Sequence, residues 1–274
     1  MKRTITACPW IFALAILLDP TQSVFAIQTF TADPGWTALG NTSGGNNYGY
    51  SGTTNHAGGA TGEAGGTFAR STLESYYADT NLAQSFNLNQ FIQASGKFDL
   101  PNTNTFSSEV FIGHISSSAG TANASDRYSL GFDIFDVSSA QFKWRVSLKT
   151  TGSDATDLNE GVGVFHFVAV NTDRTWSYLY DPNLGANGRL SVTVSGSGTF
   201  FIDLTPTARA SGATFDAFGI GIAQGLVGSD NAAQAGQVFI DDVTYSGMVP
   251  EPTSFSLIGI GLIGLSGCWR RCRR

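Results

Sequence analysis

The sequence predicts an all-β fold, an antiparallel sandwich of two sheets, and three observations predict it. Short segments alternate between apolar and polar residues, turn-forming residues separate these segments, and helical periodicity is nearly absent. The alternation is clearest in 141–149, where one face collects Phe142, Trp144, Val146 and Leu148. Period-two patterning is typical of half-buried antiparallel strands, and so many short strands favour two packed sheets.

Eleven segments are strand candidates, namely 27–32, 94–100, 106–115, 127–137, 141–149, 162–170, 176–180, 190–194, 199–204, 214–223 and 236–246. Turn signals at 181–183, 185–188 and 195–198 separate several of them. We also expect Trp144 and Trp176 to lie in the core because they fall on apolar faces. His166 alternates with two phenylalanines and is expected on a strand.

The segment Gly40–Gly66 departs from this pattern because glycine, asparagine, serine and threonine dominate it. Tyr48, Tyr50 and two glycine pairs favour an ordered loop that passes close to the sandwich. A free linker is the alternative.

Residues 1–26 have the layout of a secretory signal peptide. Lys2 and Arg3 precede the apolar run 10–18, and small residues lead to a cleavage site after Ala26. A membrane anchor is the alternative, but the run has nine residues against the roughly 20 that span a bilayer.

Residues 248–274 have three parts in a fixed order. The triplet Pro250, Glu251 and Pro252 comes first, the apolar run 255–269 follows, and a basic cluster closes the chain with Arg270, Arg271, Arg273 and Arg274. Prolines hold the triplet extended, and arginines stay on the cytoplasmic side of a membrane. As a helix the run measures about 22 Å, short for a hydrocarbon core of about 30 Å. A transient span is therefore favoured over an ordinary single-pass anchor.

This tail resembles the PEP-CTERM sorting signal of Gram-negative bacteria. The resemblance implies that signal peptidase and an exosortase process the chain, which lies transiently in the inner membrane and then at the cell surface or outside the cell. It leaves open whether processing releases the protein or attaches it to another molecule.

Between these ends, 27–247 forms one domain, long enough to bury a core. The three cysteines, Cys8, Cys268 and Cys272, lie in the ends, so the body has neither a disulfide nor a thiolate nucleophile. Six of the 15 basic and two of the 21 acidic residues also lie there, which leaves the body with a formal charge of −10. Such a charge disfavours nucleic acid and acidic polymers and is compatible with cations or neutral glycans.

The body resembles concanavalin A-like, or laminin-G-like, jelly rolls. The resemblance rests on 176–194, where a strand, a Tyr-Asp-Pro turn and a glycine loop lead to the next strand, and on the closing strand 238–245. It implies the fold, whereas the fold serves lectins, glycosidases and inert surface domains alike.

Asp241 and Asp242 are adjacent acids in an apolar strand, so alternation directs one of them toward the core or a sheet margin. A buried carboxylate needs compensation, and calcium is one remedy. In the carbohydrate-binding modules that this strand resembles, an acid here helps to hold structural calcium, and Asp33 could supply another ligand. The alternative is that one aspartate caps backbone amides and the other faces water.

Aromatic rings in or near loops are candidate glycan-binding residues, because exposed rings stack on sugar faces. The candidates are Trp36, Tyr48 and Tyr50, with Tyr76 and Tyr77 as further loop rings; core filling is the alternative. Lys143, Arg145 and Lys149 form a basic strand face that either meets an acidic polysaccharide or is solvated.

We do not expect an enzyme. A Glu-x-Asp-x-x-Glu strand, a histidine pair at metal-ligand spacing and a Gly-x-Ser-x-Gly elbow are all missing from the sequence. The leading hypothesis is an exported, exopolysaccharide-associated protein with a lectin-like sandwich. A purely structural matrix protein and a divergent glycan-cleaving enzyme are the alternatives.

Overall fold

The computed structural model describes residues 27–70, 74–101, 109–118, 127–135, 141–150, 158–159, 166–169, 173–222 and 231–247. The signal peptide with Ala26, the Pro250–Pro252 triplet and the arginine cluster at 270–274 lie outside these residues. Their predicted roles therefore stay predictions.

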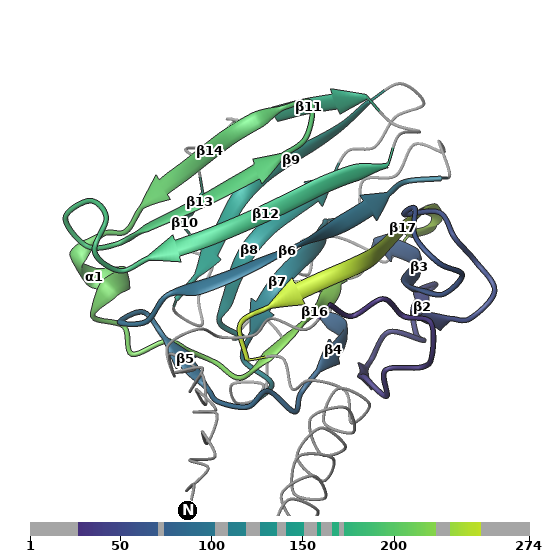
Figure 1. Cartoon of the computed structure of the whole chain (residues 1–274), viewed down its shortest axis with the longest axis horizontal. Coiled ribbons are helices and arrows are strands. Elements are labelled where there is room, and N and C mark those ends of the chain that lie inside the picture. Colours follow the sequence, from purple (N-terminus) through teal and green to yellow (C-terminus); the bar gives the residue numbers. More distant parts are fainter. Residues whose placement is uncertain are drawn as a thin grey trace, which may run out of the picture.

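Two antiparallel sheets form a sandwich (Figure 1). The eight-stranded sheet has the order β1-β4-β16-β7-β8-β9-β10, with β11 also paired to β9. Its strands are β1 (Thr37–Leu39), β4 (Ser75–Asp79), β16 (Ala217–Ile222), β7 (Val110–Ile115), β8 (Ser129–Phe135), β9 (Gln141–Lys149), β10 (Leu158–Asn159) and β11 (His166–Ala169).

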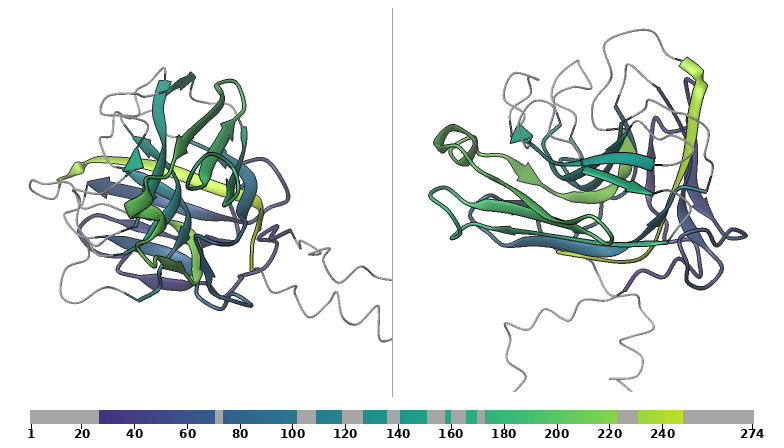
Figure 2. Two further views of the ribbon diagram at one scale, coloured as in Figure 1. Left: turned by 90° about the vertical axis from the view of Figure 1, so that its left-hand side faces the viewer. Right: turned by 90° about the horizontal axis from the view of Figure 1, so that it is seen from above.

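The seven-stranded sheet has the order β14-β13-β12-β6-β17-β3-β2 and packs face to face on the first sheet (Figure 2). Its strands are β14 (Gly198–Asp203), β13 (Arg189–Val194), β12 (Arg174–Asp181), β6 (Ile92–Asp99), β17 (Asn231–Tyr245), β3 (Glu63–Arg70) and β2 (Asn47–Ser51). A small sheet pairs β5 (Phe86–Asn87) with β15 (Thr214–Phe215), and α1 (Pro206–Arg209) is a single helical turn.

The core lies between the inner faces of the two sheets, where alternating side chains interlock. On β9 the predicted apolar face is fully buried, and Trp144 and Trp176 are core residues as predicted. Phe132 packs against both tryptophan rings, with centroid distances of 6.4 and 5.4 Å. The predicted all-β class and two-sheet antiparallel jelly-roll sandwich are thereby confirmed.

The glycine-rich segment Gly40–Gly66 is ordered, as favoured above, and contributes β2 and the start of β3. Its glycines permit close pairing: a Cβ on Gly65 would lie 2.2 Å from the carbonyl oxygen of Val238 on β17. The strand predicted at 27–32 is reduced to one bridge between Gln28 and Val243. β1, β2, β3 and β4 were not among the predicted strands, because short or glycine-rich strands carry weak alternation.

Candidate functional site

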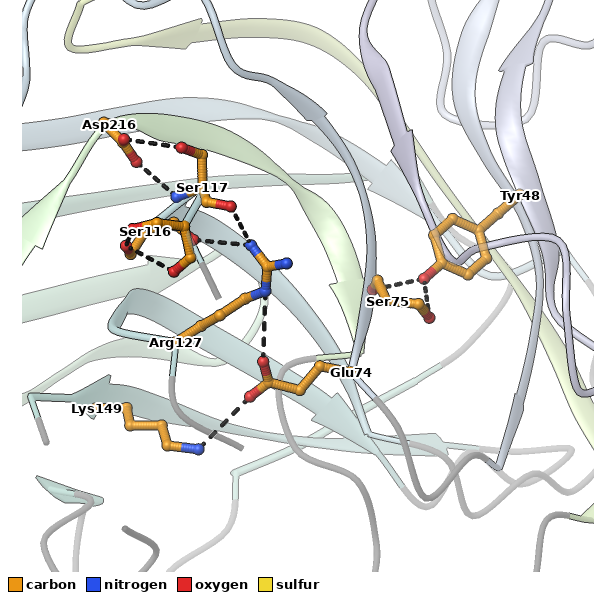
Figure 3. Close-up of polar contacts among 9 residues, drawn as sticks. Tyr48, Glu74, Ser75, Ser116, Ser117, Arg127, Lys149 and Asp216 are labelled. Atoms are coloured by element: carbon orange, nitrogen blue, oxygen red, sulfur yellow. Dashed lines mark hydrogen bonds and ion pairs between the residues drawn. The ribbon is translucent and has the colours of Figure 1, made fainter. Parts of the chain in front are cut away.

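The predicted glycan-binding rings lie in the core. Trp36 is 8% exposed and packs on Phe30 and Tyr77, with centroid distances of 5.2 and 5.5 Å. Tyr48 is 3% exposed, stacks on Phe68 at 4.0 Å, and donates its hydroxyl hydrogen to the carbonyl oxygen of Ser75 at 2.6 Å (Figure 3). Neither ring offers a face to a sugar, so the expectation of exposed rings is wrong for both.

The other aromatic residues predicted to lie in or near loops are also buried or half-buried. Tyr50 is half-buried against the core, and Tyr76 and Tyr77 lie on β4 as buried residues. Core filling, the alternative weighed above, describes these aromatic side chains.

Asp241 and Asp242 occupy a β-bulge in β17, where the register with β6 shifts between Asp241 and Thr244. Asp241 is buried, and its Oδ1 accepts from the backbone amide of Asp242 at 2.7 Å. Asp242 has a φ of 49° and forms a 2.6 Å ion pair with Lys97. Both carboxylates lie beside Gly59, where an added Cβ would come within 2.1 Å of Oδ2 of Asp241 and 3.6 Å of Oδ2 of Asp242. Alternation therefore does not send the two aspartates to opposite faces, because the bulge interrupts it.

Burial raises the pKa of Asp241 to about 6, and the nearby Asp242 and Glu63 carboxylates act in the same direction. Among the described residues, no three His, Cys, Asp or Glu side chains are grouped to hold a metal ion. Asp33 accepts from the Gly35 amide and the Tyr77 hydroxyl. Calcium at Asp241 and Asp242 therefore stays a prediction.

The predicted basic strand face lies on the outer side of the eight-stranded sheet, where Lys149 is buried and Lys143 and Arg145 are half-buried. Lys149 is 3% exposed, with its Nζ 3.5 Å from Oε1 of Glu74. The Nε of Arg145 lies 3.3 Å from Oδ2 of Asp133, and the same guanidinium pairs with Glu109. The expectation of a solvated face is wrong for Lys149 and Arg145, because acidic side chains from other strands pair with both.

Glu74 joins two cations in a buried cluster (Figure 3). Besides Lys149, it contacts Arg127, whose Nε lies 3.7 Å from Oε2 of Glu74. Arg127 also donates to the carbonyl oxygens of Ser116 and Ser117 at 3.0 and 2.6 Å. Burial raises the pKa of Glu109 well above its usual range, as expected for a carboxyl group taken out of water.

A row of small residues lies under these charges. Cross-strand register aligns, from β4 to β9, Ala78, Gly219, Gly113, Gly131 and Ser147. A Cβ on Gly113 would meet the Leu130 carbonyl oxygen at 2.3 Å and the Phe111 ring at 2.7 Å. Because these positions carry little or no side chain, a larger neighbour such as Phe111 can lean over them.

The outer face of the seven-stranded sheet is different, because it carries an open groove. The groove has a volume of about 370 Å³, within the usual range for ligand sites. Its lining residues are uncharged, and the side chains that project outward are Gln93, Ser95, Ser177, Leu179, Ser191, Thr193 and Thr244.

The strands position these side chains by simple alternation. On β12, Trp176, Tyr178 and Tyr180 point into the core, so Ser177 and Leu179 point outward and are exposed. The β17 bulge lies beside Thr244, and bulges increase local twist. Gly96 on β6 makes room for this bulge, since a Cβ on Gly96 would lie 2.7 Å from the Val243 side chain.

Charged side chains flank the groove as ion pairs. Lys97 binds Asp242 beyond one side. Beyond the other, Arg189 Nε lies 2.6 Å from Oδ1 of Asp203, and its guanidinium covers the Phe201 ring at 3.7 Å. The hydroxyls of Ser95, Ser177 and Thr244 form no hydrogen bond within the described part of the chain. The groove is therefore electrically neutral and offers unused hydrogen-bonding groups.

Comparisons with known proteins add a decisive observation at the C-terminus. The family described as the PEP-CTERM protein-sorting motif matches residues 249–274. The chain carries a PEP-CTERM sorting signal. This PEP-CTERM motif marks an exported protein, and it confirms the tail resemblance. Within the residues that the structure describes, no helix is long and apolar enough to cross a membrane.

No curated protein matches the chain in sequence. Among solved structures, the alginate lyase Aly36B is 11% identical with a TM-score of 0.46, covering 83% of this chain and 98% of that one. An endo-β-1,4-glucuronan lyase of the fungus Trichoderma reesei is 12% identical with a TM-score of 0.47, covering 81% and 95%. A Bacteroides ovatus mixed-linkage glucan GH16 protein is 13% identical with a TM-score of 0.41, covering 81% and 94%. At these values we draw nothing about substrate or activity.

Proposed function

We propose that the protein is exported, processed by an exosortase at its C-terminal signal, and held at the cell surface or in the extracellular matrix, where its sandwich binds glycans. The groove on the outer face of the seven-stranded sheet supports this most directly. It is open, uncharged and lined by hydroxyl and amide side chains, the groups that bond to sugar hydroxyls.

The location follows from the two ends. Signal peptidase removes 1–26, and the tail 255–269 holds the chain in the inner membrane until the exosortase acts at Pro250–Pro252. The intact mass of protein recovered from its host tests this step. We expect a mass that lacks 255–274; a mass that includes them indicates a permanent anchor instead.

The glycan role is tested by binding of the full chain, solubilised in a mild detergent, to a panel of polysaccharides that includes the host's own exopolysaccharide. Each measurement is made with calcium and with a chelator. We expect saturable binding of at least one polysaccharide. If a folded protein binds none in either condition, a structural matrix role without a specific ligand replaces this proposal.

The chelator arm addresses the calcium prediction at Asp241 and Asp242. Binding or thermal stability that depends on calcium, and loses this dependence in Asp241→Asn, supports a bound cation. Release of new reducing ends from any polysaccharide in the panel would indicate a glycan-cleaving enzyme.

A further inference from the structure

A row of hydroxyl side chains crosses five neighbouring strands, and its members on four of them line the groove. Thr199 on β14 pairs with Thr193 on β13, which pairs with Ser177 on β12. Ser177 pairs with Ser95 on β6, and Ser95 with Thr244 on β17. Figure 1 shows these strands side by side in the layer facing the viewer. We call these five residues the hydroxyl row.

The row is long and regular. Neighbouring strands lie about 4.8 Å apart, so five strands place hydroxyl groups along roughly 19 Å. Ser95, Ser177 and Thr199 are exposed, and Thr193 and Thr244 are half-buried. Only the pair at one end is engaged, with Thr193 and Thr199 hydroxyl oxygens 2.7 Å apart. Equally spaced donors and acceptors suit a ligand that itself repeats, such as a polysaccharide chain.

Two apolar side chains lie beside the row. Phe201 on β14 and Leu179 on β12 are 48% and 40% exposed, and Ser191 on β13 lies between them in register. They stand about 10 Å apart, two strand spacings. A pyranose ring has a polar edge and apolar C–H faces, and this surface offers hydroxyl groups next to apolar ones.

The charges around the groove indicate which class of polysaccharide it would bind. Two cationic side chains that flank the groove, Lys97 and Arg189, are ion-paired with Asp242 and Asp203. Outside the two ends the chain has a formal charge of −10. A uronate polymer would find no unpaired cation here and would be repelled by the body as a whole.

From these observations we propose that the groove binds a neutral, extended polysaccharide laid across the strands along the hydroxyl row, with Leu179 and the face of the Phe201 ring away from Arg189 as apolar supports. This rests on the proposed glycan function and names the ligand class and its direction.

The test uses the full chain in detergent and neutral hexose oligosaccharides from disaccharide to octasaccharide. We expect affinity to rise with length and level off once the oligosaccharide covers the row. Ser177→Ala, at the centre, should weaken binding at every length, and a triple variant Ser95→Ala, Ser177→Ala and Thr193→Val should weaken it at least tenfold. Thr199→Val should shorten the length at which affinity levels off.

The matched control is Thr214→Val, an exposed strand threonine in the small sheet of β5 and β15. It should bind like the unaltered protein, and all variants should melt at the same temperature. Binding that is independent of length, or unchanged in the triple variant, overturns the hydroxyl-row proposal while leaving glycan binding intact. Tighter, salt-sensitive binding of a uronate polymer overturns the neutral class. Absence of any glycan binding overturns both proposals together.

Discussion

The two outer faces of the sandwich use polar side chains in opposite ways. The seven-stranded sheet exposes short hydroxyl side chains around an uncharged groove. The eight-stranded sheet buries long charged side chains in ion pairs over glycine positions. Both faces follow the same strand alternation, so alternation alone does not separate a surface for binding from one that stabilises the fold. The length of the polar side chain and the glycines beneath it do.

The largest expected effect tests the buried face. Lys149→Met removes a cation that contacts Glu74, which Arg127 also contacts among the described residues, and breaking a buried ion pair costs about 3–5 kcal/mol. Since Arg127 remains, we expect a loss near 3 kcal/mol in the free energy of unfolding, measured with urea. The double variant Glu74→Gln with Lys149→Met should recover part of it. A loss below about 0.5 kcal/mol would mean that this face behaves like an ordinary surface.

The glycine positions give the next effect. In Gly219→Ala the new Cβ would lie 2.4 Å from the Tyr77 carbonyl oxygen and 2.7 Å from the Cβ of Ala78. Overpacking of this kind costs about 1–3 kcal/mol. Gly49→Ala on β2 is the control, because no atom lies within 4 Å of its new Cβ. Equal stability of the two variants in chemical denaturation would contradict the role given to the glycine row.

The ionisation of Asp241 makes the stability of the protein depend on pH. Its pKa is about 6 in the folded protein and about 4 in an unfolded chain. The folded state therefore binds the proton more tightly, so this residue destabilises the protein progressively as pH rises from about 4 to 6. Asp241→Asn should raise stability at pH 7 by about 2 kcal/mol and have little effect below pH 4.

His114 supplies the opposing slope. Burial lowers its pKa to about 4, so it favours folding as pH rises through the same interval. Thermal melts of the unaltered protein and of Asp241→Asn at several pH values measure how much of the pH dependence of stability Asp241 causes. An Asp241→Asn curve parallel to the original would contradict the pKa assignment, and a loss of stability confined to calcium-containing buffer would point to a bound cation.

The smallest effect on stability belongs to the open face. Ser177→Ala should change the free energy of unfolding by less than about 0.5 kcal/mol, since the hydroxyl is exposed and forms no hydrogen bond with the described residues. Its effect should fall on glycan binding instead. A large stability loss in this variant would remove the contrast between the two faces.

The sequence predicted the sandwich well because apolar alternation on β9, β12 and β13 is strong enough to assign each strand an inner face. The sequence also identified the sorting signal, because this signal is defined by the order of its three parts along the chain and not by the tertiary fold. It failed for Trp36 and Tyr48, because a ring near a glycine loop can fold back into the core as easily as face water.

The groove could not be found in this way. Ser177 and Thr193 are visible as outward positions once the strand is known, but which strands are neighbours is a property of the tertiary fold. The same limit applies to Lys149, whose partner Glu74 is distant in sequence. The groove and the Glu74–Lys149 ion pair both depend on which strands are neighbours, and a single sequence does not reveal this.

The position of β17 has a consequence for the timing of assembly. This strand comes last in the chain, yet it lies between β6 and β3 inside the seven-stranded sheet. Until Tyr245 has been synthesised and exported, β2 and β3 have no connection to the rest of that sheet. The sandwich can close only after nearly the whole chain has crossed the membrane, with the sorting signal at 249–274 following directly behind. Because this closure depends on contacts between segments distant in sequence, we expect the seven-stranded sheet to form slowly.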